Sequence, residues 1–192
     1  MDQPFKFRSS LKMNRGSVVM TKLTTFCPLT KIKLSQGALK LLTIPNAGGS
    51  SVISEVLSLE FLSRSFGAHL LKTEMEVEYW PQGGSITDYV ARIYDQIIGV
   101  SVTRAMKYGG DFAMDDAIRL LNKKLQGVNR STANNQEGWS KQVLHVWATD
   151  KKTAAYVLKA WQMLDETVRS DTVVVITVCY SIPGLFFERK MG

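Results

Sequence analysis

The sequence predicts a single α/β domain with a mixed sheet, whose elements follow the order α-β-β-β-α-β-α-β. Three observations predict this class. Apolar residues recur at helical spacing in some stretches, they alternate or run together in shorter stretches, and turn residues separate the two kinds. With 192 residues, of which 45% are hydrophobic and 21% charged, the chain is long enough to bury a core without a disulfide or a metal.

A turn-rich stretch over residues 44–51 precedes the first predicted helix and offers Ser50 or Ser51 as its N-cap. Apolar residues at helical spacing predict that this helix runs from residue 52 to about residue 65. Gly67 is placed to end it. This helix therefore has a wide apolar face.

Three strands are predicted next, over residues 74–80, 85–93 and 97–104. The first two alternate between polar and apolar residues, and the third is rich in β-branched residues. Turns over residues 81–84 and 94–96 separate them, so the three strands form a meander.

The second half of the chain alternates helices with strands. We predict a helix over 114–126 closed by Gly127, a polar loop over 129–140, a strand over 142–148, a helix from 151 to about 164 capped by Asp150, and a strand over 172–180. The last strand is almost continuously apolar, which indicates burial on both faces.

We divide the chain into a basic N-terminal segment (1–45), an α/β core (46–181) and a C-terminal tail (182–192). The net charge of +7 lies in the first of these, because residues 1–40 hold eight Lys and Arg residues against one Asp. The rest of the chain is balanced, so the charge indicates a basic arm or surface segment and says little about the core.

Several kinds of protein are disfavoured. Cys27 and Cys179 match no metal-ligand spacing and are interpreted as reduced thiols, and two histidines give little support to a zinc site. No apolar run is long enough to span a bilayer. We expect an intracellular protein, nuclear or cytoplasmic, while the basic, acid-poor N-terminus also has features of a mitochondrial presequence.

A helix, a three-strand meander, a helix and a strand over about residues 50–180 resemble the core of the restriction-endonuclease-like, or PD-(D/E)XK, nuclease superfamily. The resemblance implies a metal-dependent phosphodiesterase that acts on DNA or RNA. In that family a carboxylate on the first helix, an Asp near the start of the second strand and a Glu-x-Lys pair on the third converge on Mg²⁺. Mn²⁺ is an alternative ion, because hard divalent cations share a preference for oxygen ligands.

Two residues match the metal ligands of that family. Asp88 lies at the start of the second strand, in a stretch that is otherwise apolar. On the first helix Glu55 shares the apolar stripe, whereas Glu60 precedes Arg64 by four residues, the spacing of an exposed ion pair. The predicted metal ligands are therefore Glu55 and Asp88, although an early-turn Glu also simply favours the helix dipole.

The third strand departs from the family pattern, because Ser101-Val102-Thr103 stands in place of Glu-x-Lys. We predict that Ser101 or Thr103 lines the site. Lys124 on the second helix, or Arg104, would supply the catalytic cation, and the stem of Lys124 can cross the apolar surface of its helix.

Nucleic-acid contacts are predicted for a basic row that runs along the same helix, Arg119, Lys123 and Arg130, and for Lys107, which lies just before that helix. Such a row can follow a phosphate backbone, although a basic helical face is most often simply solvated. Glu74, Glu76 and Glu78 alternate on the first strand and are interpreted as a charged edge or as a source of the missing ligand.

Four aromatic residues of the predicted meander are candidates for stacking on bases or for packing, namely Tyr79, Trp80, Tyr89 and Tyr94. The alternative function is a non-catalytic interaction or assembly subunit that keeps the fold. Its protein or nucleic-acid partner would bind the basic arm or the apolar tail residues 182–187.

Overall fold

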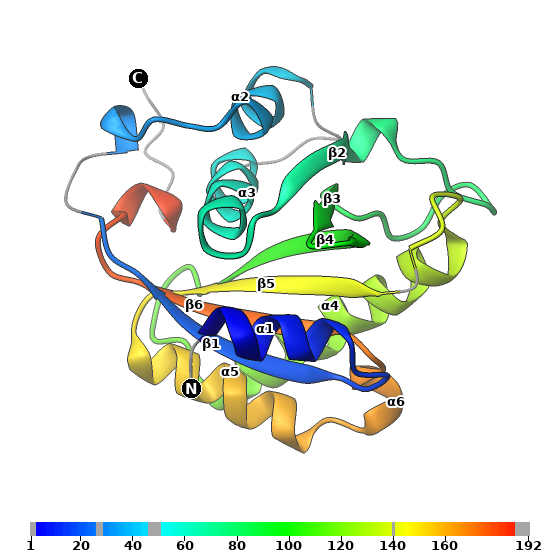
Figure 1. Cartoon of the computed structure of the whole chain (residues 1–192). Helices are drawn as coiled ribbons and strands as arrows, with labels where there is room; N and C mark the ends of the chain where they lie inside the picture. The colour runs from blue at the N-terminus through cyan, green and yellow to red at the C-terminus, as the bar shows by residue number, and fades with distance from the viewer. Residues whose placement is uncertain (1–2, 26–28, 46–50, 140, 187–192) are drawn as a thin grey trace.

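The computed structural model describes residues 3–25, 29–45, 51–139 and 141–186 and shows a six-stranded mixed sheet between two layers of helices (Figure 1). The strands are β1 (Ser17–Leu23), β2 (His69–Thr73), β3 (Tyr89–Ile93), β4 (Gln96–Ala105), β5 (Gln142–Ala148) and β6 (Val173–Cys179). The helices are α1 (Gln3–Leu11), α2 (Gln36–Thr43), α3 (Val52–Phe66), α4 (Met114–Asn134), α5 (Lys151–Met163) and α6 (Glu166–Arg169). Short 3-10 helices cover Leu29–Lys31, Glu74–Glu76 and Pro183–Leu185.

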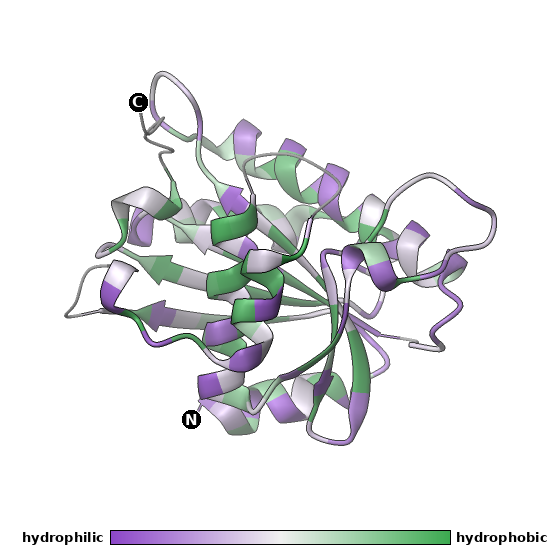
Figure 2. Cartoon of the chain, turned by 90° about the horizontal axis from the view of Figure 1, so that it is seen from above, coloured by the Kyte–Doolittle hydropathy of each residue, from purple (hydrophilic) through white to green (hydrophobic). Residues whose placement is uncertain are grey.

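The sheet has the strand order β1-β6-β5-β4-β3-β2. Strands β1, β6, β5 and β4 are parallel neighbours, while β3 and β2 continue the sheet as an antiparallel meander. One hydrophobic cluster joins the sheet to α1, α2 and α3, and a second joins the opposite face to α4 and α5. Figure 2 shows hydrophobic residues along the central strands. The parallel strands are buried on both faces, as their apolar sequences predict.

The predicted α/β class and element order are confirmed, since α3, β2, β3, β4, α4, β5, α5 and β6 follow one another in that order. The second half of the chain agrees most closely. Strand β5 covers residues 142–148, and the Asp150 side chain caps α5 by accepting a hydrogen bond from the backbone N–H of Thr153. Every residue of β6 is buried.

The first strand of the meander lies at residues 69–73 instead of 74–80. Thr73 ends it and caps the 3-10 helix that follows, because Glu76 accepts hydrogen bonds from the backbone N–H and the hydroxyl of Thr73. Local side-chain capping therefore overrides the alternating pattern. Glu74, Glu76 and Glu78 consequently do not share one face of a strand.

Helix α4 continues to Asn134, so Gly127 does not end it. Val128 and Ser131 extend its buried face beyond the glycine, which keeps the last two turns packed on the sheet. Asn135 closes the helix, and its side-chain amide donates hydrogen bonds to the carbonyls of Thr132 and Trp139.

The N-terminal segment contributes a strand that sequence reasoning does not place. Strand β1 pairs in parallel with β6 from Ser17 opposite Val173 to Leu23 opposite Cys179, so the sheet extends beyond residues 46–181. Helix α1 packs in the hydrophobic cluster that contains α3, where the Phe7 ring stacks on the Phe66 ring with 4.2 Å between centroids. Residues 3–23 are therefore part of the folded domain and do not form a separate basic arm.

The tail also packs inward. Ile182, Leu185 and Phe186 are buried in the cluster that contains α3, whereas Phe187 lies outside the described residues. Cys179 is a buried free thiol, and burial raises its pKa. Cys27 also lies outside the described residues. Among the helices that the structure describes, none is both long enough and apolar enough to cross a membrane.

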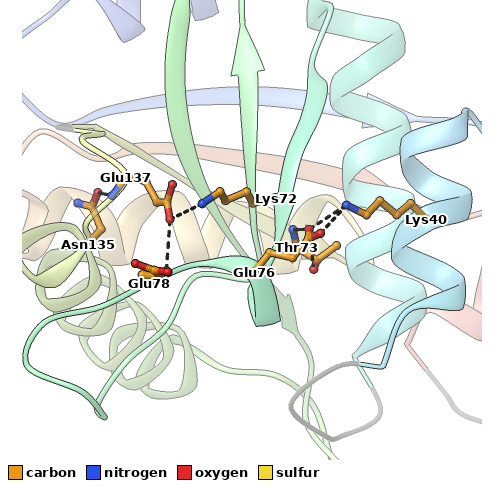
Figure 3. A network of polar contacts seen from close by, with 7 residues as sticks. All are labelled: Lys40, Lys72, Thr73, Glu76, Glu78, Asn135 and Glu137. Atoms are coloured by element: carbon orange, nitrogen blue, oxygen red, sulfur yellow. Dashed lines mark hydrogen bonds and ion pairs between the residues drawn. The ribbon is translucent and has the colours of Figure 1, made fainter.

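Two ion pairs hold the edge strand β2 and the segment after it, as Figure 3 shows. Lys40 of α2 contacts Glu76 at 2.7 Å, and Lys72 of β2 contacts Glu137 at 2.7 Å. Glu137 also accepts a hydrogen bond from the backbone N–H of Glu78. Each of these partly exposed pairs contributes at most about 1 kcal/mol, so they fix the path of the chain more than they stabilise it.

Deleting residues 1–23 is expected to abolish cooperative folding. The deletion removes α1 and turns the fully buried β6 into an exposed apolar edge, which favours aggregation. Size-exclusion chromatography and thermal unfolding by circular dichroism measure this. The double substitution Lys12→Gln and Arg15→Gln removes two exposed charges from the same segment and should leave the melting temperature within a few degrees. An unchanged melting temperature after the deletion would contradict the structural role of β1.

Candidate functional site

The candidate site lies at the N-terminal end of β3, where the neighbouring strand β4 extends beyond it. Asp88 is the residue before β3, and its backbone N–H donates to the carbonyl of Val100 at 3.0 Å. One oxygen of its carboxylate accepts a hydrogen bond from the backbone N–H of Val102. Strand β4 runs on to Ala105, so its last residues have no β3 partner beside them. This gap lets side chains from both helical layers approach Asp88.

The alternation of β4 decides which side chains face which layer. Val100 and Val102 belong to the hydrophobic cluster that contains α3, whereas Ala105 belongs to the cluster that contains α4. Since neighbouring residues of a strand point to opposite faces, Ser101 and Thr103 face α4 and Arg104 faces α3. Arg104 also donates a hydrogen bond at 3.3 Å to the carbonyl of Leu185 in the tail.

Glu55 is buried in the first turns of α3. Burial raises the pKa of its carboxyl, and a hydrogen bond from Ser51 partly opposes this. The negative charge of Glu74 also raises that pKa, while Lys124 and Arg104 lower it. Glu55 therefore lies within electrostatic reach of both predicted catalytic cations.

Asp88 is perturbed still more. Burial is the main cause that raises its pKa to about 7, and the charge of Glu55 adds to the effect. The hydrogen bond from Val102 and the charge of Lys124 act in the opposite direction. Clusters of strongly perturbed carboxyl groups are typical of functional sites. The structure thus brings Glu55, Asp88, Lys124 and Arg104 together, from four different elements or their ends.

Ser101 and Thr103 are buried on the α4 side of β4. The Ser101 hydroxyl lies 3.5 Å from the hydroxyl of Thr87, the residue before Asp88. Neither residue supplies a carboxylate, so neither completes a set of metal ligands. Tyr79 is tied to the same segment, because its hydroxyl oxygen accepts a hydrogen bond from the backbone N–H of Thr87 at 2.8 Å.

A buried chain of hydroxyl groups and one imidazole fixes α3 against β3. Ser58 Oγ lies 2.8 Å from Tyr89 Oη and 2.7 Å from His145 Nδ1. His145 Nε2 lies 2.8 Å from Thr177 Oγ1, which in turn lies 2.6 Å from Thr21 Oγ1. Burial lowers the pKa of His145 to about 3, so its ring is neutral. One ring nitrogen therefore donates and the other accepts.

This chain also positions the acidic pair. Ser58 follows Glu55 by nearly one helical turn, and Tyr89 follows Asp88 directly. The hydrogen bond between Ser58 and Tyr89 therefore holds the two backbones that carry the carboxylates at a fixed separation. Sequence reasoning missed this function of Ser58 and His145. The signal that could have revealed it is a polar residue within a strand that is otherwise apolar.

The four residues predicted to contact nucleic acid fall into two groups, those that pair with Asp116 and those that are exposed on α4. Arg119 and Lys107 both form ion pairs with Asp116, and the pKa of Asp116 is lowered by hydrogen bonds from the backbone of Ala113 and from these cations. Lys123 and Arg130 are exposed on α4. Lys124 is half-buried, in keeping with a position at the edge of the apolar face.

Glu60 stands apart from this site. It pairs with Arg64 at 2.5 Å and accepts a hydrogen bond from the backbone N–H of Ser35 at 2.7 Å. The predicted ion pair is therefore present, but Glu60 is buried where an exposed pair was expected. Its carboxylate stabilises the start of α2.

The donor set can be compared with the needs of a metal ion. Within residues 3–25, 29–45, 51–139 and 141–186, no group of three or more His, Cys, Asp or Glu side chains is placed to hold one. Glu55 and Asp88 form a pair of carboxylates. Such a pair suits Mg²⁺, which keeps several water molecules and is often held by one or two carboxylates together with substrate phosphates.

The substitution Asp88→Asn is expected to stabilise the protein above neutral pH. The folded state raises the pKa of Asp88 from 3.8 to about 7, so folding favours the protonated acid. Ionisation of Asp88 therefore lowers the free energy of unfolding as the pH rises from about 4 through 7. The advantage of the variant over the parent should grow across this range and reach about 1–3 kcal/mol at pH 8.5.

Urea unfolding at pH 5 and pH 8.5 measures this difference. The matched control is Asp95→Asn, in the exposed turn between β3 and β4, which should change the free energy of unfolding by less than about 0.5 kcal/mol. A difference between Asp88→Asn and the parent that does not depend on pH would show that Asp88 titrates normally.

No family model matches the sequence. It is 43% identical over 165 residues to the "AAC-rich mRNA clone AAC4 protein" of Dictyostelium discoideum, a match that covers 82% of this chain and 24% of that protein. The chain thus spans about a quarter of the length of this relative, whose name states no activity. Among solved structures, SfsA of Pyrococcus furiosus in complex with Ca²⁺ matches with a TM-score of 0.33 and 13% identity, over 73% of this chain and 71% of that one.

Proposed function

We propose that this chain is a metal-dependent phosphodiesterase that acts on nucleic acid. The observation that supports this most directly is the buried pair of Glu55 and Asp88 with Lys124 and Arg104 in electrostatic reach. The pair occupies the helix and strand positions at which the PD-(D/E)XK nucleases, which the chain resembles in element order, carry their acids. Acids and cations gathered around one gap are the groups that phosphoryl chemistry requires.

The two carboxylates would hold one Mg²⁺ ion. The charge of Glu55 raises the pKa of Asp88, which shows that the two negative charges oppose each other. A divalent cation between them would remove this repulsion. Val102 already occupies one oxygen of Asp88, so the other oxygen is the one left for a ligand. Bound there, the ion would activate water and stabilise negative charge on the phosphate.

The remaining residues of the chain would bind and orient the phosphate. Lys124 would take the place of the lysine that the third strand lacks, because α4 faces the same side of β4 as Ser101 and Thr103. Arg104 would stabilise charge from the α3 side of the gap, and Ser58 with Tyr89 would keep the acids in place. Positioned cations contribute most when they are fixed before the substrate binds.

A second candidate is a non-catalytic subunit that keeps this fold for assembly. One observation favours it, namely that Ser101 and Thr103 supply no third carboxylate among the described residues around the gap. Such a subunit would bind nucleic acid or a protein without cleaving it. The two candidates differ in whether a metal ion and the acidic pair are needed for any reaction.

Cleavage should depend on the acidic pair. With labelled single- and double-stranded DNA and RNA as substrates, the separate substitutions Glu55→Gln and Asp88→Asn are expected to lower the Mg²⁺-dependent rate by about 100-fold or more, because each removes a ligand charge. Asp95→Asn is the matched control and should retain the parental rate. If the parent cleaves none of these substrates with Mg²⁺ or Mn²⁺, the protein is not a nuclease and the assembly function is favoured.

Substitutions of two adjacent lysines on α4 distinguish an effect on the chemical step from an effect on substrate binding. Lys124→Ala is expected to lower kcat by about 10- to 100-fold, because it removes a cation that faces the acids. Lys123→Ala alters the neighbouring exposed residue and should raise KM by a few fold with little change in kcat. Steady-state kinetics on the substrate that is cleaved best measures both values. Equal effects of the two substitutions on kcat would contradict the assigned function of Lys124.

A further inference from the structure

An exposed tryptophan lies on the segment that leads into the acidic site. The Trp80 side chain is 72% exposed, whereas Trp139 and Trp147 are buried in the protein. Exposure of so large a ring forgoes the free energy that burial would supply. Tryptophan is enriched among the residues that supply most of the binding energy at interaction surfaces.

The backbone around Trp80 is fixed by contacts with the end of α4. The Trp80 N–H donates to the carbonyl of Asn134 at 2.8 Å, and the Gln136 N–H donates to the carbonyl of Glu78 at 3.0 Å. Between these two bonds Tyr79 forms a β-bridge with Asn135. The ring of Trp80 therefore projects from an anchored segment.

The same segment is connected to the acidic pair. The ring of Tyr79 packs edge-on against Trp139, with 6.3 Å between centroids, and its hydroxyl oxygen accepts the hydrogen bond from the backbone of Thr87. Thr87 directly precedes Asp88. A group bound against Trp80 would therefore be held at a constant distance from the candidate metal ligands.

A surface cavity of about 640 Å³ lies beside the tryptophan. Trp80 and Tyr79 provide aromatic surface, Gln82 and Gln136 provide side-chain amides, and Glu78 provides the one charge of the lining. A cavity with a carboxylate and no cation disfavours a phosphate group. It suits a flat neutral group whose edge carries both donors and acceptors, because amides can supply either partner. A nucleobase has this chemistry.

A cation, Arg130, lies beside the glycine that follows this lining. Gly83 lines the cavity, and a Cβ placed on the following Gly84 would lie 3.6 Å from Cδ of Arg130. Arg130 is exposed and belongs to the basic row of α4. The surface thus provides an aromatic cavity without a cation in its lining, next to the cation of Arg130, which matches the alternation of base and phosphate along a strand.

We propose that this cavity binds one unpaired base of a single-stranded nucleic acid, stacked on Trp80, while Arg130 contacts the neighbouring phosphate. This inference rests on the proposed function and specifies its substrate class. Bases in a duplex have both faces covered by their neighbours, so only a single-stranded or displaced base can stack on the ring. The chain should therefore prefer single strands to duplexes.

Binding measurements on the full chain test the inference without cleavage. In an Asp88→Asn background with EDTA, the anisotropy of labelled 12-nucleotide DNA and RNA single strands and of the matching duplexes gives the dissociation constants. We expect tighter binding of single strands, and we expect Trp80→Ala to weaken it by about 5- to 150-fold. Trp80→Phe should retain most of the affinity, because phenylalanine also stacks. Tyr108→Ala, which removes another aromatic side chain that is 75% exposed, is the matched control.

The salt dependence separates stacking from charge. Trp80→Ala should leave the slope of log Kd against log salt unchanged, whereas Arg130→Ala should reduce its magnitude by about 0.7, the value for one phosphate contact on a single strand. Oligonucleotide binding should also quench tryptophan fluorescence in the parent and much less in Trp80→Phe.

The outcomes distinguish this inference from the proposed function. Trp80-dependent binding in a chain that cleaves nothing would support the base site and contradict the catalysis. Cleavage with equal effects of Trp80→Ala and Tyr108→Ala on binding would overturn the base site alone. The absence of any single-strand binding would overturn the inference. A change in self-association by sedimentation when Trp80 is replaced would also overturn it and would assign this ring to an interface between copies of the chain.

Discussion

The buried hydrogen-bond chain that starts at Ser58 is the constraint on which the site depends. It joins α3 to β3, β5, β6 and β1 through Tyr89, His145, Thr177 and Thr21. A buried hydrogen bond contributes only about 1 kcal/mol net, but a partner left without one costs more. The polar atoms therefore permit few alternative arrangements of helix and sheet, whereas an apolar contact tolerates sliding. The separation of Glu55 and Asp88 follows from this restriction.

The fixed separation explains why an unfavourable pair of acids persists in a folded protein. Burial and mutual repulsion raise the pKa of Asp88 to about 7, so the site is destabilising whenever both acids are ionised. A core selected for stability alone would place apolar residues there. Trp147 of β5 illustrates the compensation, since its ring is fully buried and its N–H donates to the carbonyl of Ser54 beside Glu55. The two hydrophobic clusters on the faces of the sheet therefore offset the cost of burying the two acids.

Sequence reasoning recovers the elements whose signals are local. Strand β5 and the start of α5 are placed correctly because burial periodicity and the Asp150 cap are encoded in neighbouring residues. It also selects Glu55 over Glu60, because helical spacing places the first of them on the stripe that faces the sheet. Asp88 and Lys124 follow from the element order and from the apolar row of α4. Each of these residues is selected from the sequence pattern of the single predicted helix or strand that carries it.

The failures share a physical cause, which is competition from contacts that are distant in the sequence or from side-chain caps. Strand β1 contains the β-branched residues Val18, Val19 and Thr21, but its place at the edge of the sheet is decided by pairing with β6, which lies 156 residues away in the sequence. Glu74, Glu76 and Glu78 alternate like a strand, yet the Thr73 cap and the ion pair of Glu76 with Lys40 hold the backbone otherwise.

The repulsion between the two acids would give the proposed metal ion a further consequence. The charge of Glu55 raises the pKa of Asp88, so the two carboxylates oppose each other when both are ionised. A phosphate at the acids would add to this repulsion. A divalent ion between the acids would offset it, so the ion and the phosphate would bind cooperatively, as linkage between two sites of opposite charge requires. The proposed base cavity beside Trp80, whose one charged lining residue is Glu78, does not involve the acids. Binding through the base would therefore precede the metal, whereas docking of the phosphate at the acids would require it.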